Sequence, residues 1–223
     1  GLVSIALSTA SILVSYIFFF FFIKDLKILD DDLLAKNWFK AALFFNVISS
    51  LGTFYLAYMM ATKNVVQDWY LSSIYYYLHF QYNGWFFFAC MGLAFGFLNL
   101  RKSEHSFYET SFKLFAIACV PAYFLSSLWL VLPLWIYIIT VIAALVQVYA
   151  WFKFLPILLK TRKNVLESYS PLLRYILVFV SFALSIKLLL QLGSTVPIIS
   201  QLAFGFRPLV IASLHLLLLG LIT

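Results

Sequence analysis

Charged residues are scarce in this chain, and that scarcity excludes the soluble classes of protein. Only 10% of its 223 residues are Asp, Glu, Lys or Arg, whereas 65% are hydrophobic and 20% are aromatic. Soluble domains carry about 25% charged residues, so the composition fits no soluble class. The net charge of +7 does not indicate nucleic-acid binding. In a membrane protein, loop Lys and Arg residues orient the helices instead.

Cysteine and recognisable catalytic motifs are also missing or rare. The two cysteines, Cys90 and Cys119, lie in apolar stretches without CxxC spacing, which favours packing roles over a disulfide or a zinc site. The sequence contains no phosphate-binding loop, no catalytic-triad motif and no CxxCH haem attachment motif. These absences disfavour the common soluble enzyme classes.

Long apolar runs are what the chain has in abundance. A bilayer core of about 30 Å requires about 20 apolar residues per helix. Backbone N–H and C=O groups without hydrogen-bond partners are too costly in lipid, so we expect each run to be helical. We therefore predict an all-α, polytopic transmembrane bundle that forms a single domain over residues 1–223. Its seven predicted spans are 1–23, 40–61, 73–98, 112–132, 134–156, 172–193 and 201–223. Because neither end carries a polar tail, we expect the chain to be a fragment of a longer protein.

Basic residues gather in alternate loops and predict the orientation. Of the fifteen Lys and Arg residues, four lie in 24–40, three in 99–113 and five in 153–174. The positive-inside rule places these three loops in the cytoplasm, with residue 1 outside and residue 223 inside. We expect a multi-pass protein of the bacterial inner membrane, with the lipid bilayer as its main partner and no nucleic acid.

Two polar groups in the loops receive less weight as sites. Asp30, Asp31 and Asp32 form a run of carboxylates, but four lysines surround it, which favours a solvated face or a helix cap over a cation site. His105 lies in a loop without an evident partner.

Ionisable and amide side chains inside the predicted spans are the candidates for function. A charge in a bilayer is costly and by default faces the interior of the bundle. His79 and Asn83 are four residues apart and share one helix face, and Lys187 and Gln191 have the same spacing. Depth along each span predicts one layer in the outer half of the membrane: His79, Asn83, Lys187, Gln191 and Arg207.

Two further polar residues are predicted to lie deeper. His215 falls near the middle of the last span, and Gln147 falls deeper than the outer layer in the fifth. Two imidazoles in separate spans, beneath Lys187 and Arg207, would suit a haem, with nitrogen ligands for iron and cations for the propionates. A copper or zinc site needs more ligands than these. Structural roles remain open: the cations can snorkel to the interface, and the amides can join helices by hydrogen bonds.

Two blocks of sequence prompt a family resemblance. His79–Phe86 (HFQYNGWF) and Arg207–Leu216 (RPLVIASLHL) resemble an uncharacterised polytopic membrane-protein family of Bacteroidota. That family is itself distantly similar to subunit I of haem–copper oxidases, which includes the large subunits of cytochrome c oxidase and nitric oxide reductase. The resemblance implies a larger bundle of about twelve helices, and other respiratory-type membrane subunits as partners.

The resemblance also implies a cofactor, and the sequence departs from the family pattern there. It implies haem, with copper less certain. The implied metal ligands are His79 and His215, and the further cofactor-binding residues are Asn83, Arg207 and Lys187. Oxidase subunit I uses more histidine ligands than the two that lie in the spans of this chain. These 223 residues therefore cannot build a complete haem–copper centre.

Three functions remain as hypotheses. The first is haem or metal binding for redox chemistry, which would make the protein a membrane-bound oxidoreductase if it is an enzyme. The second is a transporter or channel for a small anionic or protonatable solute. In that case Lys187, Arg207, Gln147 and Asn83 would line the path, although the chain shows no inverted repeat. The third is a non-catalytic membrane subunit.

Overall fold

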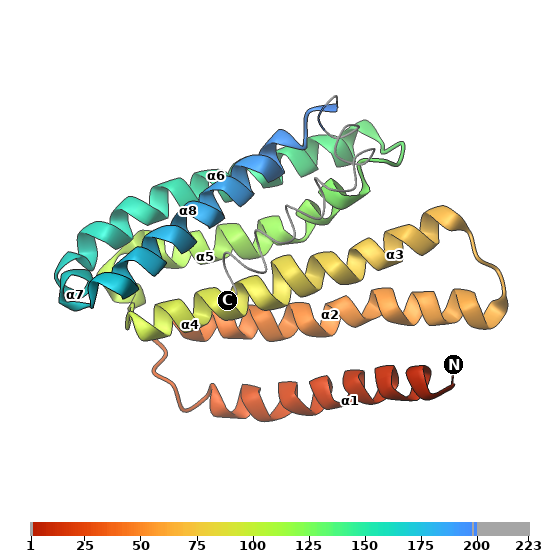
Figure 1. Ribbon diagram of the computed structural model, residues 1–223, viewed down its shortest axis with the longest axis horizontal. Helices are drawn as coiled ribbons and strands as arrows, with labels where there is room; N and C mark the ends of the chain where they lie inside the picture. The colour runs from red at the N-terminus through yellow and green to blue at the C-terminus, as the bar shows by residue number, and fades with distance from the viewer. Residues whose placement is uncertain (1, 198, 200–223) are drawn as a thin grey trace. The chain divides into compact units, whose positions relative to one another are not determined.

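The computed structural model describes residues 2–197 and 199, and every regular element among them is a helix (Figure 1). The predicted all-α class is therefore confirmed for this part of the chain. The predicted seventh span, 201–223, lies outside the described residues, together with Arg207 and His215.

Contacts divide the chain into two compact units, Gly1–Arg101 and Lys102–Thr223. The first unit contains α1 (Leu2–Asp25), α2 (Leu34–Thr62), α3 (Gln67–His79), the π-helix η1 (Phe80–Phe86) and α4 (Phe87–Phe97). The second contains the 3₁₀ turn η2 (Lys102–Glu104), α5 (Ser106–Cys119), the 3₁₀-helix η3 (Pro121–Ser127), α6 (Leu134–Thr161), α7 (Lys163–Ser168) and α8 (Pro171–Gly193).

Four of these helices are long and apolar enough to cross a membrane. They are Ala6–Asp25, Leu34–Thr62, Leu134–Thr161 and Pro171–Gly193. The pair α5 and η3, bent by 43° at their junction, adds a fifth if it is counted as one broken span. Apolar helices of this length are those of a protein that contacts a lipid bilayer.

Predicted span 112–132 falls on two consecutive elements, α5 and η3, instead of on one continuous α-helix. The α-helix begins at Ser106 and ends at Cys119, and the chain continues as a 3₁₀-helix from Pro121 to Ser127. Proline at this point has no N–H to donate, and its ring clashes with the carbonyl four residues earlier, so the α-helical ladder stops. Helix α6 also extends to Thr161, beyond the predicted end at 156, and it includes Pro156.

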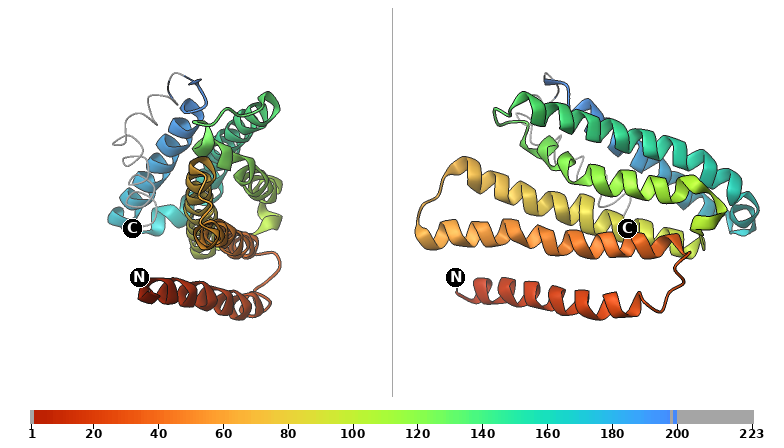
Figure 2. Two further views of the ribbon diagram at one scale, coloured as in Figure 1. Left: turned by 90° about the vertical axis from the view of Figure 1, so that its right-hand side faces the viewer. Right: turned by 180° about the vertical axis from the view of Figure 1, so that it is seen from behind.

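Predicted span 73–98 corresponds to three elements in sequence, α3, η1 and α4. The residues at both junctions, His79 and Phe86, keep right-handed helical backbone angles. Because no turn interrupts the chain from Gln67 to Phe97, the three elements form one helical rod beside α2 (Figures 1 and 2).

Large aromatic side chains fill the core of the first unit. The buried Trp38 indole lies 5.0 Å from the Phe88 ring and 5.2 Å from the Phe95 ring, measured between centroids. Gly92 of the same rod admits the neighbouring Phe39 ring, because a Cβ there would lie 2.8 Å from that ring. The rod and α2 are therefore joined by aromatic rings set against glycine.

The loop between α1 and α2 is tied to the end of α4. The Leu34 amide donates to the Leu100 carbonyl at 2.9 Å, and Leu33 and Arg101 form an isolated antiparallel bridge. The Arg101 guanidinium binds the Asp30 carboxylate at 2.6 Å. The first and third loops therefore lie at the same end of this unit.

Another carboxylate of that loop, that of Asp31, also binds a basic side chain. Buried Lys36 donates from Nζ to an Asp31 carboxylate oxygen and to the Leu29 carbonyl, each at 2.7 Å. Asp32 donates its backbone N–H to the Asp30 carboxylate. The carboxylates of Asp30 and Asp31 thus both bind basic side chains.

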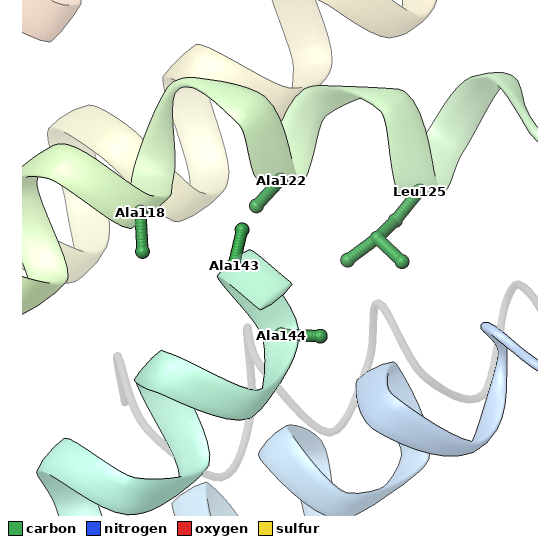
Figure 3. Close-up of a cluster of buried hydrophobic side chains, with 5 residues drawn as sticks. All are labelled: Ala118, Ala122, Leu125, Ala143 and Ala144. Carbon is green, nitrogen blue, oxygen red and sulfur yellow. The ribbon is translucent and has the colours of Figure 1, made fainter. Parts of the chain in front are cut away.

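A cluster of small residues lies in the core of the second unit, alongside large buried rings such as Tyr108 and Phe154. Figure 3 shows the cluster in which α5 and η3 meet α6, formed by Ala118, Ala122, Leu125, Ala143 and Ala144. At one end of the unit, the Arg162 guanidinium binds the Glu104 carboxylate at 2.6 Å. The segment before α5 and the segment after α6 therefore lie at the same end.

Candidate functional sites in the two units

The sequence block that prompted the family resemblance adopts an unusual backbone. Residues Phe80–Phe86 form a π-helix, whose hydrogen bonds join each residue to the fifth before it. Such segments are rare, and they appear frequently at functional sites because the wider turn displaces side chains from the α-helical pattern. The π-helix begins directly after His79, so this histidine lies where the backbone changes its winding.

His79 and Asn83 meet on one face of this segment, as their spacing predicts. His79 is 5% exposed, and the Asn83 amide nitrogen lies 3.4 Å from its Nδ1. The Phe80 ring stands edge-on to the imidazole, with centroids 5.1 Å apart. An amide can be turned to offer either its N–H or its oxygen, so Asn83 can hold Nδ1 in either tautomer of the ring.

A second polar cluster joins the π-helix to α2, and the sequence analysis missed it. The Gln81 side-chain amide donates to the Asn46 side-chain oxygen at 3.0 Å and to the Ser49 hydroxyl at 2.6 Å. Asn46 and Ser49 are both buried. The available signal was Asn46 and Ser49 at helical spacing within an apolar run, with Ser50 alongside. The Ser50 hydroxyl also meets the Tyr16 hydroxyl of α1 at 2.6 Å.

Gly84 is the point of closest approach between the π-helix and α2. A Cβ at this position would lie 2.6 Å from the Cβ of Phe45, closer than real Cβ contacts come. Gly84 therefore admits Phe45 as a close neighbour. The Phe45 ring in turn stacks on Phe80 at 5.7 Å.

In the second unit, the predicted polar residues of α8 face α6. The Gln191 side-chain amide donates to the Gln147 side-chain oxygen at 2.6 Å. This bond places the two amides at one level, so the prediction that Gln147 lies deeper than Gln191 is wrong. Lys187 lies one turn before Gln191 and close enough to Cys119 of α5 to interact with it electrostatically.

The structure therefore groups the predicted site residues only in part. His79 and Asn83 are together in the first unit, and Lys187 and Gln191 are together in the second. Arg207 and His215 lie outside the described residues. The third histidine, His105, has a structural role: its Nδ1 accepts the backbone N–H of Phe107 and caps α5.

The fit of a metal or haem can be judged from the donors present. Within residues 2–197 and 199, no three His, Cys, Asp or Glu side chains are grouped as a metal site would need. This part of the chain does not build the multi-ligand copper or zinc site that soft metals prefer. A haem iron can be held by a single protein histidine, and the buried imidazole of His79 is a donor of that kind.

Comparisons with known protein families, with curated proteins and with solved structures found no match. The resemblance to the Bacteroidota family and to oxidase subunit I therefore stands on the two sequence blocks alone.

Proposed function

We propose that this chain belongs to a multi-pass protein of the bacterial inner membrane that binds haem through His79 and serves redox chemistry. The proposed topology has seven spans in this chain, counting the rod α3–η1–α4 and residues 201–223, within a larger bundle of about twelve. The three basic loops face the cytoplasm, as the positive-inside rule predicts. Transport and a non-catalytic subunit remain the alternative hypotheses.

One observation carries the proposal: a buried histidine held by Asn83 at the start of a π-helix within a long apolar rod. A histidine that ligates iron has its second ring nitrogen fixed by a hydrogen-bond partner, which sets the tautomer and the ring plane. When Asn83 turns its amide oxygen toward Nδ1, the ring donates Nδ1–H to it. Nε2 then carries the lone pair that a metal requires.

The surroundings of His79 suit a flat apolar group. Phe80 is buried beside the imidazole, and Tyr76 packs on Phe80 with ring centroids 4.7 Å apart. A bound haem would supply the one-electron chemistry. The residues of this chain would orient the imidazole and keep water away from it.

The experiment is an absorption spectrum of the full-length protein, expressed in membranes and purified in detergent, recorded oxidised and after dithionite. We expect a Soret band that shifts on reduction, that is lost in His79→Ala and that persists in His105→Ala. His105 provides the matched control, because it caps α5 and lies in the other unit. A folded wild-type protein that shows no Soret band after addition of haemin would overturn the proposal.

Asn83 offers a second, finer test. In Asn83→Leu, Nδ1 loses the amide, so we expect haem to remain bound with a changed reduction potential or an altered visible spectrum. An Asn83→Leu protein with an unchanged potential and spectrum would show that the amide does not hold the ligand.

A further inference from the structure

We propose that the second unit binds the phosphate group of an anionic phospholipid through Lys153 and Tyr149 of α6, at a site independent of His79. The site lies on an exposed face of α6, near the end at which this helix leaves the apolar part of the membrane.

Two hydrogen-bond donors lie side by side on this face. The Lys153 ammonium donates to the Tyr149 hydroxyl, and the nitrogen and the oxygen are 3.0 Å apart. Both residues are exposed. The hydroxyl accepts from the ammonium, so it keeps its own proton to donate, and the ammonium keeps two further N–H groups. The pair can therefore donate together to two oxygens of one phosphate, in charge-assisted hydrogen bonds.

Two aromatic rings hold the ammonium in position. The Lys153 nitrogen lies 4.6 Å from the centroid of the Phe107 ring and 5.5 Å from that of the Tyr149 ring. Phe107 of α5 is buried and stands edge-on to Tyr149, with ring centroids 6.3 Å apart. Attraction between a cation and such rings restrains the lysine side chain. Less conformational freedom is then lost when a phosphate binds.

The position of Lys153 along α6 matches the level of the lipid headgroups. Helix α6 begins at Leu134, and Lys153 follows 19 residues later, or about 28 Å along the axis. The hydrocarbon core of a bilayer is about 30 Å thick. Lys153 therefore stands near the boundary between the acyl chains and the headgroups, where it can reach a lipid phosphate.

The charges of this unit leave Lys153 complementary to an anion. Residues 102–197 contain three acidic residues, Glu104, Glu109 and Glu167. They form ion pairs with Arg162, Lys113 and Lys163, respectively. None of the ion pairs among the described residues includes Lys153, whose ammonium contacts Tyr149 and Phe107. Basic groups at the end of a membrane helix attract anionic lipids, so a phospholipid can supply the negative charge that the described chain does not bring to this lysine.

The test uses thermal unfolding of the full-length protein in detergent micelles that contain phosphatidylglycerol or phosphatidylcholine with the same acyl chains. The first lipid is anionic and the second is zwitterionic. A ligand that binds only the folded state raises Tm, so we expect phosphatidylglycerol to raise Tm by about 2–4 °C more than phosphatidylcholine near saturation. Lys153→Met should abolish this difference, and Tyr149→Phe should reduce it.

Lys160→Met is the matched control. Lys160 is exposed and lies seven residues after Lys153, on the same face of α6. It has none of the aromatic contacts that Lys153 makes. The variant removes the same charge as Lys153→Met, and we expect the difference between the two lipids to persist in it.

Three results would overturn the proposal. Equal responses to the two lipids would remove the preference for an anionic headgroup. An equal loss in Lys160→Met and Lys153→Met would assign the response to the general positive charge of this helix end. A full response to inorganic phosphate without lipid, at equal ionic strength, would assign the site to a soluble anion. A haem-free protein that still distinguishes the two lipids would support this site while the redox proposal failed.

Discussion

The two units both pack their helices with large buried rings, and they differ in the small residues that lie beside those rings. In the first, rings such as Phe39 and Phe45 lie against glycines of the neighbouring rod. In the second, Ala118, Ala143 and Ala144 let the helix backbones themselves come close. Lipid chains are as apolar as a protein interior, so in both units the close fit of side chains stabilises helix association more than the removal of apolar surface from water does.

The polar side chains within the helices of the two units also differ. In the first unit neutral groups bind one another, because Gln81 meets Asn46 and Ser49 while His79 meets Asn83. In the second unit a formal charge, Lys187, accompanies a single pair of amides. A neutral network fixes a geometry, whereas a charge within an apolar helix is costly.

Removing volume should damage the first unit most. Trp38→Ala would leave a cavity beside Phe88 and Phe95, and we expect it to lower the free energy of unfolding by about 3–5 kcal/mol. The measurement is equilibrium unfolding in mixed detergent micelles. Trp69→Ala removes an indole that is 60% exposed, so it should have a much smaller effect. Equal losses in the two variants would contradict the idea that buried rings hold this unit together.

Adding volume should damage the second unit. Ala144 is 1% exposed at the contact of α6 with α5 and η3, and Ala144→Leu would force these helices apart. We expect a loss of about 1–3 kcal/mol in the same unfolding measurement. Ile142→Leu, at a position that is 52% exposed, should change stability by less than about 0.5 kcal/mol. A neutral Ala144→Leu variant would mean that the alanine contact is loose.

The neutral network should contribute less than the packing. Gln81→Leu removes both hydrogen bonds from the π-helix to α2, and such bonds in membranes are worth about 1 kcal/mol. We expect a loss of that size, and a weaker effect for Gln67→Leu at the exposed start of α3. Hydrogen exchange at Phe80–Phe86 should also increase in Gln81→Leu. Unchanged exchange there would show that the network does not hold the π-helix.

The smallest effect should come from the ion pair at the first loop. The Asp32 backbone N–H and the Arg101 guanidinium hold the pKa of the Asp30 carboxyl below its usual range. A carboxyl with a lowered pKa in the folded state stabilises it above the unfolded pKa of about 3.9 and loses that contribution as the pH falls through the folded value. Stability should therefore decline slightly below about pH 4 in the wild type. It should decline less in Asp30→Asn, as measured by unfolding from pH 5 to pH 3.

Arg101→Gln tests the same ion pair by changing its basic member. The Asp32 N–H remains in this variant, so the pH dependence should weaken without disappearing. A profile identical to that of the wild type would show that Arg101 does not act on Asp30.

Apolar length was enough to predict most of the helices, because the bilayer requirement is a property of each run alone. Helix α8 begins at Pro171, one residue from the predicted start, and ends at Gly193 as predicted. The break before Pro121 did not follow from proline alone, because α6 continues through Pro156.

The π-helix could not have been predicted in that way. Nothing in the run from Phe80 to Phe86 requires hydrogen bonds to the fifth residue rather than to the fourth. In the structure, Gln81 reaches Asn46, which is 35 residues earlier, and Gly84 admits Phe45. The π-helix thus occurs together with contacts between residues that are far apart in the sequence. Local sequence identified the block as unusual and could not supply its geometry.

The contact between the first loop and the end of α4 has a consequence for biosynthesis. Leu34 bonds to Leu100, and Asp30 bonds to Arg101, so these two contacts can form only after residue 101 has been synthesised. At about 5–20 residues per second, the ribosome needs roughly 3–14 seconds to proceed from the loop to that point. During this interval the loop and its lysines remain accessible to the insertion machinery and to anionic lipids. The orientation of α1 in the membrane can therefore be set before this contact forms.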